Sequence, residues 1–151
     1  MTRREKIPSI LAGVAGEYLV AGEFSRRGWI ASLTLRNTRG ADILASNSEL
    51  TRSVGIQVKT TQRSRAVWVL NKKAESLADE HYYYVFVRLN GLGQPKFHIV
   101  PSKVVAEYTR RTHQEWLKQP RRDGQPHRDN PTRNFKDEGD QYLDRWDILN
   151  L

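Results

Sequence analysis

Residues Tyr82–Val87 form an uninterrupted run of large apolar side chains, Tyr-Tyr-Tyr-Val-Phe-Val. A strand with one face in water alternates polar and apolar residues, whereas a continuous run is typical of a strand buried on both faces. The run therefore predicts a strand that forms part of the core. The alternative is a row of exposed rings on which nucleic-acid bases stack. We expect the buried strand.

Helices and further strands are predicted around this run. Apolar residues recur at three- and four-residue spacing from Ser9 to Arg27, which predicts a helix whose buried face carries Ile10, Leu11, Val14, Tyr18, Leu19 and Phe24. A second helix is expected to begin at Ser102, as its N-cap, and to run toward Trp116. Strands are expected at 29–35, 41–45, 54–60, 66–70, 82–89 and 96–100, the last two paired as a hairpin.

The segment 119–138 has no apolar periodicity. It is rich in Arg, Asp, Asn and Pro, and Phe135 is its only large apolar residue. This composition predicts a long flexible surface loop or a disordered segment. Residues 142–149 regain apolar spacing and are expected to pack on the core, so residues 1–151 are expected to form a single domain.

The charge of the chain indicates a polyanionic partner. The net charge is +8, and the N-terminal half of the chain, as far as Lys73, carries the whole excess, with 13 Lys and Arg against 5 Asp and Glu. Basic side chains that neutralise phosphates gain free energy from counterion release, so nucleic acid is the expected partner. A basic surface that only keeps the protein in solution is the alternative.

Several classes of protein are excluded by composition. The chain has no cysteine, so it contains no disulfide, thiolate metal site or cysteine nucleophile. Its four histidines show no metal-ligand spacing, which argues against a zinc enzyme. No segment is long and apolar enough for a membrane span or a signal sequence. We expect a soluble, cytoplasmic protein with no membrane partner.

Two short motifs carry most of the chemistry: Gly40-Ala41-Asp42 and, further along the chain, Gln57-Val58-Lys59. Alternation along a strand places Gln57 and Lys59 on one face. If Asp42 lies on the adjacent strand and Glu17 approaches from the first helix, oxygen ligands suited to Mg²⁺ meet beside an ammonium group. This set favours phosphodiester hydrolysis. Taken one at a time, each residue has an ordinary alternative: Asp42 as a turn aspartate, Lys59 as a solvated strand lysine and Glu17 as a glutamate at the edge of the helix.

The chain resembles the PD-(D/E)xK nuclease superfamily in these two motifs, in Thr60-Thr61 and in Glu17 on the first helix. It is nearest to the archaeal Holliday-junction-resolvase-like branch, and the resemblance covers the chain from Met1 to about Leu70. The resemblance implies a restriction-endonuclease-like α/β (α+β) fold, a mixed central sheet flanked by helices. It implies metal ligands at Asp42 and the Val58 carbonyl, with Glu17 as the metal-binding acid of the helix and Gln57 as a further ligand or a water-positioning group. Lys59 is the implied catalytic lysine. Mg²⁺ is the implied cofactor, with Mn²⁺ as a substitute.

Two positions depart from the superfamily's pattern. Ala41 replaces the motif's proline, and Gln57 replaces its acid, which removes one negative charge and should weaken cation binding. Three functions therefore stay open. The first, which we expect, is a Mg²⁺-dependent endonuclease that hydrolyses phosphodiester bonds of DNA, with structured or branched DNA as one candidate substrate. The others are a nucleic-acid-binding module that no longer cuts, and a subunit of a larger defence or repair assembly.

Basic residues near the motifs are expected to contact phosphates, which position a duplex without reading its sequence. They are Arg36, Arg39, Arg63 and Arg65, with Lys72 and Lys73 beyond them. For each of them, a solvated loop charge is the alternative. The resemblance also implies a homodimer as a candidate assembly, because two scissile strands call for two sites.

Overall fold

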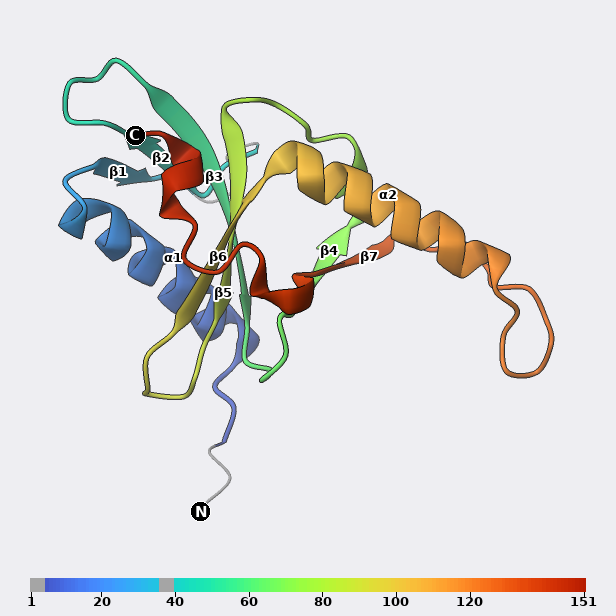
Figure 1. The fold of residues 1–151 in the computed structure, drawn as a ribbon. Helices are drawn as coiled ribbons and strands as arrows, with labels where there is room; N and C mark the ends of the chain where they lie inside the picture. Colours follow the sequence, from blue (N-terminus) through green and yellow to red (C-terminus); the bar gives the residue numbers. More distant parts are fainter. Residues whose placement is uncertain (1–4, 36–39) are drawn as a thin grey trace.

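The protein is described by a computed structural model over residues 5–35 and 40–151. Its centre is a five-stranded sheet in the order β1-β2-β3-β5-β6 (Figure 1). Neighbouring strands are antiparallel except β3 and β5, which run parallel, so the sheet is mixed. The strands are β1 Ile30–Leu33, β2 Ile43–Ser46, β3 Ser53–Thr61, β5 Tyr82–Arg88 and β6 Lys96–Pro101. The expected mixed sheet and the β5–β6 hairpin are confirmed.

The two faces of the sheet are covered by different elements. Helix α1, Ser9–Arg26, packs on one face. The other face is covered by helix α2, Ser102–Lys118, and by a two-stranded sheet of β4, Val67–Asn71, and β7, Thr132–Lys136 (Figure 1). Short 3-10 helices complete the chain: η1 Lys72–Glu75, η2 Glu138–Asp140 and η3 Trp146–Leu149. Two separate hydrophobic cores result, one on each side of the sheet.

Strand β5 contributes side chains to both cores. Tyr83, Val85 and Val87 lie in the core beneath α1, while Tyr84 and Phe86 lie in the core beneath α2 and β7. Each of these five side chains is buried. The predicted buried strand is therefore confirmed, and the base-stacking alternative is wrong for these residues.

The predicted buried face of α1 is wrong in most of its residues. Ile10, Leu11 and Tyr18 are 72%, 56% and 63% exposed, and the buried stripe is Ala12, Gly16, Val20 and Phe24. The buried stripe starts with small residues, so the first half of the helix lies close to the sheet and turns its larger side chains outward. Apolar spacing alone identified the helix correctly but not the face that packs.

Gly16 shows how close that approach is. A Cβ atom at this position would lie 1.9 Å from Thr60 Oγ1 and 3.2 Å from Thr60 Cβ on β3. Only a residue without a side chain fits there. The contact fixes the distance between α1 and β3 at the position next to Glu17.

The segment 119–138, predicted to be a flexible or disordered loop, contains strand β7. Phe135 stacks on Phe86 with ring centroids 4.8 Å apart, and β7 pairs antiparallel with β4. Arg133 is 4% exposed and bonds Glu75 at 2.5 Å. The strand was missed because one of its two inward-facing residues is a charged arginine, which in a sequence is typical of a surface position.

Helix α2 follows the prediction, except at its first residue. Pro101 precedes the helix, and Ser102 lies inside it. The Ser102 hydroxyl donates to the Asp79 carbonyl at 2.8 Å and accepts from the Asp79 N–H at 2.9 Å. The predicted N-cap role is therefore wrong, because this hydroxyl ties α2 to the chain ahead of β5. The helix and the loop after it extend beyond the sheet (Figure 1).

Within residues 5–35 and 40–151, none of the helices combines the length and the apolar character needed to cross a bilayer.

Candidate active site at the end of strand β2

The structure brings the two predicted motifs together at the N-terminal end of β2. Asp42 directly precedes this strand, and its N–H donates to the Ile56 carbonyl at 2.8 Å. Its carboxylate lies against β3, where Oδ2 accepts from Gln57 Nε2 at 2.7 Å and from the Val58 N–H at 2.8 Å. Two groups from a distant part of the sequence thus share one carboxylate oxygen.

The backbone of β3 is open toward this carboxylate because β2 stops pairing there. The β2–β3 register runs from Ser46↔Ser53 to Ile43↔Ile56, whereas β3 continues to Thr61. The N–H and C=O groups of one strand residue point to the same side. Since the Val58 N–H points at Asp42, the Val58 carbonyl also faces the side that β2 has left.

Gln57 and Lys59 occupy the expected face of β3. Both are half-buried, and they alternate with the buried side chains of Ile56 and Val58. Burial raises the pKa of Asp42 above its ordinary value, outweighing the bond from the Val58 N–H and the charge of Lys59, which both lower it. The catalytic role of Lys59 stays a prediction.

Tyr82 is a site residue that the sequence did not indicate. Its hydroxyl donates to Gln57 Oε1 at 3.1 Å. The ring lies over Gly55, where an added Cβ would come within 3.2 Å of Tyr82 Cδ2, so the missing side chain lets the ring reach Gln57. Burial, with the neighbouring Tyr84 and Asp42, raises the pKa of Tyr82, so its hydroxyl stays protonated. The residue was hidden as the first member of an apolar run.

Glu17 lies on α1, which packs against β3. It is half-buried and follows Gly16, which contacts Thr60, the residue after Lys59. The helix therefore carries Glu17 alongside the strand that bears Gln57 and Lys59. Its role as a catalytic and metal-binding acid stays a prediction.

The expected phosphate-binding residues fall into two groups. Arg36 and Arg39 lie outside the described residues. Arg63 and Arg65 are exposed in the connection that follows β3, and Lys72 and Lys73 are exposed in η1. Contact between any of them and nucleic acid stays a prediction.

A hollow of about 420 Å³ adjoins the site. Ala41, next to Asp42, forms part of its wall, and so does Tyr82, which bonds Gln57. The remaining wall is formed by Gly40, residues 76–79 and His81. The hollow therefore adjoins the site through Ala41 and Tyr82.

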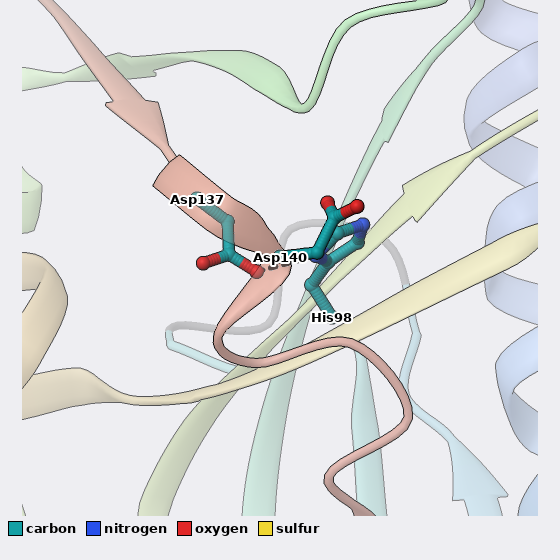
Figure 2. A group of neighbouring side chains, drawn as sticks. All are labelled: His98, Asp137 and Asp140. Carbon is teal, nitrogen blue, oxygen red and sulfur yellow. Dashed lines mark hydrogen bonds and ion pairs between the residues drawn. The ribbon is translucent and has the colours of Figure 1, made fainter.

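A second group of potential metal ligands lies where the C-terminal segment meets β6 (Figure 2). One ligand atom each from His98, Asp137 and Asp140 lies within 4.8 Å of the others, among the residues that the structure describes. His98 Nδ1 and Asp137 Oδ2 are 2.6 Å apart, and both side chains are buried. This group could hold a metal ion, and the sequence did not point to it, because Asp137 fell in the segment predicted to be a loop.

Two observations favour a structural role for this second group. Asp137 already accepts from the backbone N–H groups of Gln141 and Tyr142, at 3.0 Å each, in addition to its contact with His98. Asp140 lies 3.5 Å from a guanidinium nitrogen of Arg88, and that positive charge disfavours a cation at the same place. The group fastens the C-terminal segment to β6 and β5.

The donor chemistry at Asp42 fits Mg²⁺ better. It offers a carboxylate, an amide and a backbone carbonyl directed to the same side, and these oxygen donors suit a hard cation that keeps several waters. The orientation of the Gln57 amide opposes the fit to Mg²⁺: the amide presents its nitrogen to Asp42, and not its oxygen.

Comparisons with known proteins address the fold. No protein-family model and no curated protein matches the chain. Among solved structures it is similar to the bacterial homing endonuclease I-Ssp6803I, with a TM-score of 0.60 and 15% identity over 96% of this chain and 94% of that chain. It also matches Hjc, a Holliday junction resolvase from the archaeal hyperthermophile Archaeoglobus fulgidus, with a TM-score of 0.47 and 16% identity over 82% of this chain and 83% of that chain.

At these identities the similarity concerns the fold, and the homing endonuclease is the match that supports it. The match spans nearly the full length of both chains and includes the mixed sheet with helices on both of its faces. The chain therefore has the restriction-endonuclease-like fold that the resemblance of its motifs to PD-(D/E)xK nucleases predicted.

Proposed function

We propose that the protein is a Mg²⁺-dependent endonuclease that hydrolyses phosphodiester bonds of DNA. The observation that carries the proposal is the position of the Asp42 carboxylate at the open edge of β3, bonded to Gln57 and Val58 and close to the charge of Lys59. The fold shared with a homing endonuclease supports it, and so does the basic excess of the N-terminal half of the chain.

The residues of the site have separate tasks in this proposal. Asp42, the Gln57 amide oxygen and the Val58 carbonyl would hold Mg²⁺, with Glu17 contributing from α1. A bound ion would supply Lewis acidity to the scissile phosphate and to a water molecule there. The Lys59 ammonium stabilises the negative charge that develops on the phosphate oxygens and orients the attacking water. Arg63 and Arg65 would hold the flanking phosphates.

Structured or branched DNA is the substrate class that we propose within this function. It is supported by the resemblance of the motifs Gly40-Ala41-Asp42 and Gln57-Val58-Lys59 to the resolvase-like branch of the superfamily.

The test is a cleavage assay on linear duplex, single-stranded and four-way-junction DNA with Mg²⁺, Mn²⁺ or EDTA. We expect metal-dependent products from the native protein and none from Asp42→Ala or Lys59→Ala, with circular dichroism showing that both variants are folded. Preferential cleavage of the junction would support the narrower substrate class. Products that persist in EDTA or in both variants would contradict the proposed site.

A second candidate function is a DNA-binding module that does not cut. It is favoured by the bond from Gln57 Nε2 to Asp42, because this nitrogen occupies the side of the carboxylate that a cation would share. A silent module predicts salt-sensitive DNA binding with no products in any metal. Binding measured at low and at moderate salt concentration, beside the cleavage assay, separates the two functions.

A further inference from the structure

Three side chains, from β5, from β3 and from the residue before β2, form one hydrogen-bonded series at the site. Tyr82 Oη donates to Gln57 Oε1 at 3.1 Å, and Gln57 Nε2 donates to Asp42 Oδ2 at 2.7 Å. The amide of Gln57 therefore has its acceptor end on the tyrosine and its donor end on the carboxylate. Both ends are occupied in the structure.

This orientation satisfies Asp42 in the absence of a cation. The carboxylate is half-buried, and a buried carboxylate needs donors to replace lost water. The Gln57 amide nitrogen and the Val58 N–H both point at Oδ2 and supply them. An oxygen at the position of that amide nitrogen would repel the carboxylate.

The same orientation cannot ligate a cation. Mg²⁺ takes oxygen ligands, and an amide NH₂ group has no lone pair available to offer. For Gln57 to share an ion with Asp42, its amide must turn over so that Oε1 and Nε2 exchange places. This requirement rests on the proposed function of Asp42 and Gln57 as ligands.

We propose that Tyr82 positions the Gln57 amide in both orientations, and that the amide turns over when a divalent cation joins Asp42. A tyrosine hydroxyl can donate and accept, so it can donate to Oε1 in the structure shown and accept from Nε2 in the turned state. Its ring is held over Gly55, which keeps the hydroxyl beside the amide. Tyr82 is thus a positioning residue that acts through Gln57.

The variant Tyr82→Phe removes the hydroxyl and keeps the ring. We expect it to weaken Mg²⁺ binding, measured by titration calorimetry in the absence of DNA, by about 3- to 10-fold, because one neutral hydrogen bond no longer supports the turned amide. Tyr84→Phe is the matched control. It removes a hydroxyl two residues further along β5, within the core beneath α2 and β7. This change should alter the Mg²⁺ affinity by less than about twofold.

A second background separates positioning from packing. In Gln57→Glu both ends of the side chain are oxygens, so there is no wrong orientation to correct. The effect of Tyr82→Phe on Mg²⁺ affinity should therefore shrink to less than about twofold in that background. An equal loss in both backgrounds would show that Tyr82 acts only through packing and would overturn the proposal.

A direct readout uses protein labelled with ¹⁵N-glutamine, in which the Gln57 side-chain NH₂ signal is identified by its loss in Gln57→Glu. We expect Mg²⁺ to move this signal in the native protein, and Tyr82→Phe to move it already without Mg²⁺. A signal that Tyr82→Phe leaves unchanged would overturn the role of Tyr82. Absence of any Asp42-dependent Mg²⁺ binding, in the native protein and in Gln57→Glu, would overturn the cation site itself and this inference with it.

Discussion

Asp137 and Asp42 both form close hydrogen bonds, and they differ in which carboxylate oxygens those bonds use. Asp137 uses both carboxylate oxygens: Oδ1 accepts from the Gln141 N–H, and Oδ2 from the Tyr142 N–H beside His98 Nδ1. Both bonds to Asp42 converge on Oδ2, and among the described residues no hydrogen bond reaches its Oδ1. The fold uses both oxygens of the first carboxylate, whereas the bonds that the described residues make to the second converge on one oxygen.

The difference shows how a structural aspartate can be told from a candidate ligand. Asp137 is fully enclosed, lies in a loop that it shapes, and has a guanidinium near its partner Asp140. Asp42 is half-buried beside a hollow, at a place where one strand ends and the next continues. We expect substitutions at Asp137 to act on stability and substitutions at Asp42 to act on chemistry.

The largest expected effect is on cleavage. Asp42→Asn keeps an oxygen for the Val58 N–H but removes the charge, so we expect cleavage of a junction substrate to fall by about 100-fold or more. Lys59→Ala should cause a loss of similar size. Urea unfolding of both variants should give a free energy of unfolding close to that of the native protein. A large loss of stability in Asp42→Asn would contradict the distinction between the two aspartates.

A large effect on stability is expected at the other aspartate. Asp137→Ala leaves two backbone N–H groups and the buried His98 without their partner, which should lower the free energy of unfolding by about 3 kcal/mol. The exposed Asp123→Ala is the control. It removes a surface ion pair with Arg121 and an exposed bond from the Gln125 N–H, and it should cost less than about 1 kcal/mol. Equal stability of the two variants would show that the buried group does not fasten the C-terminal segment.

A smaller effect is expected where α1 meets β3. Gly16→Ala places a methyl group against Thr60, so we expect a loss of about 1–3 kcal/mol in the free energy of unfolding. Gly13→Ala on the same helix meets open space and should instead stabilise the helix by about 0.5–1 kcal/mol. Adding Thr60→Ala to Gly16→Ala should recover part of the loss. Equal effects at positions 13 and 16 would contradict the close contact.

The smallest expected effect is a pH dependence. The pKa of Asp42 is raised in the folded state, so the folded protein holds a proton there more readily than the unfolded chain does. The contribution of Asp42 to stability is therefore most favourable below its ordinary pKa of 3.8 and is lost as pH rises through the raised value. Urea unfolding from pH 3 to 7 should show the native protein losing stability relative to Asp42→Asn as pH rises. The opposite trend would show that the hydrogen bonds to Asp42, which lower its pKa, outweigh the effect of burial, which raises it.

Much of the fold and the centre of the site could be predicted from the sequence, because both depend on local patterns. The apolar run at Tyr82–Val87 determines a strand buried on two faces, and alternation places Gln57 and Lys59 together wherever the strand lies. The link to Asp42 needed a resemblance, because nothing in the spacing alone pairs residue 42 with residue 57.

The misses have a common physical cause, which is that they depend on contacts between distant segments. The packing face of α1 is determined by Thr60, because only a glycine, Gly16, fits on the helix opposite this side chain. Arg133 is buried because Glu75 and nearby carbonyls bind it, and Tyr82 reaches the site because Gly55 has no side chain. In each case the informative residue lies tens of positions away, beyond the reach of a periodicity argument.

Strand β5 has a consequence for how the protein unfolds. Its residues alternate between the core under α1 and the core under α2 and β7, so neither core can open without exposing side chains of the strand that supports the other. Two cores on separate faces would otherwise be free to melt at different temperatures. Sharing one strand makes their loss cooperative, and a single thermal transition, seen alike by tryptophan fluorescence and by far-ultraviolet circular dichroism, is the behaviour to expect.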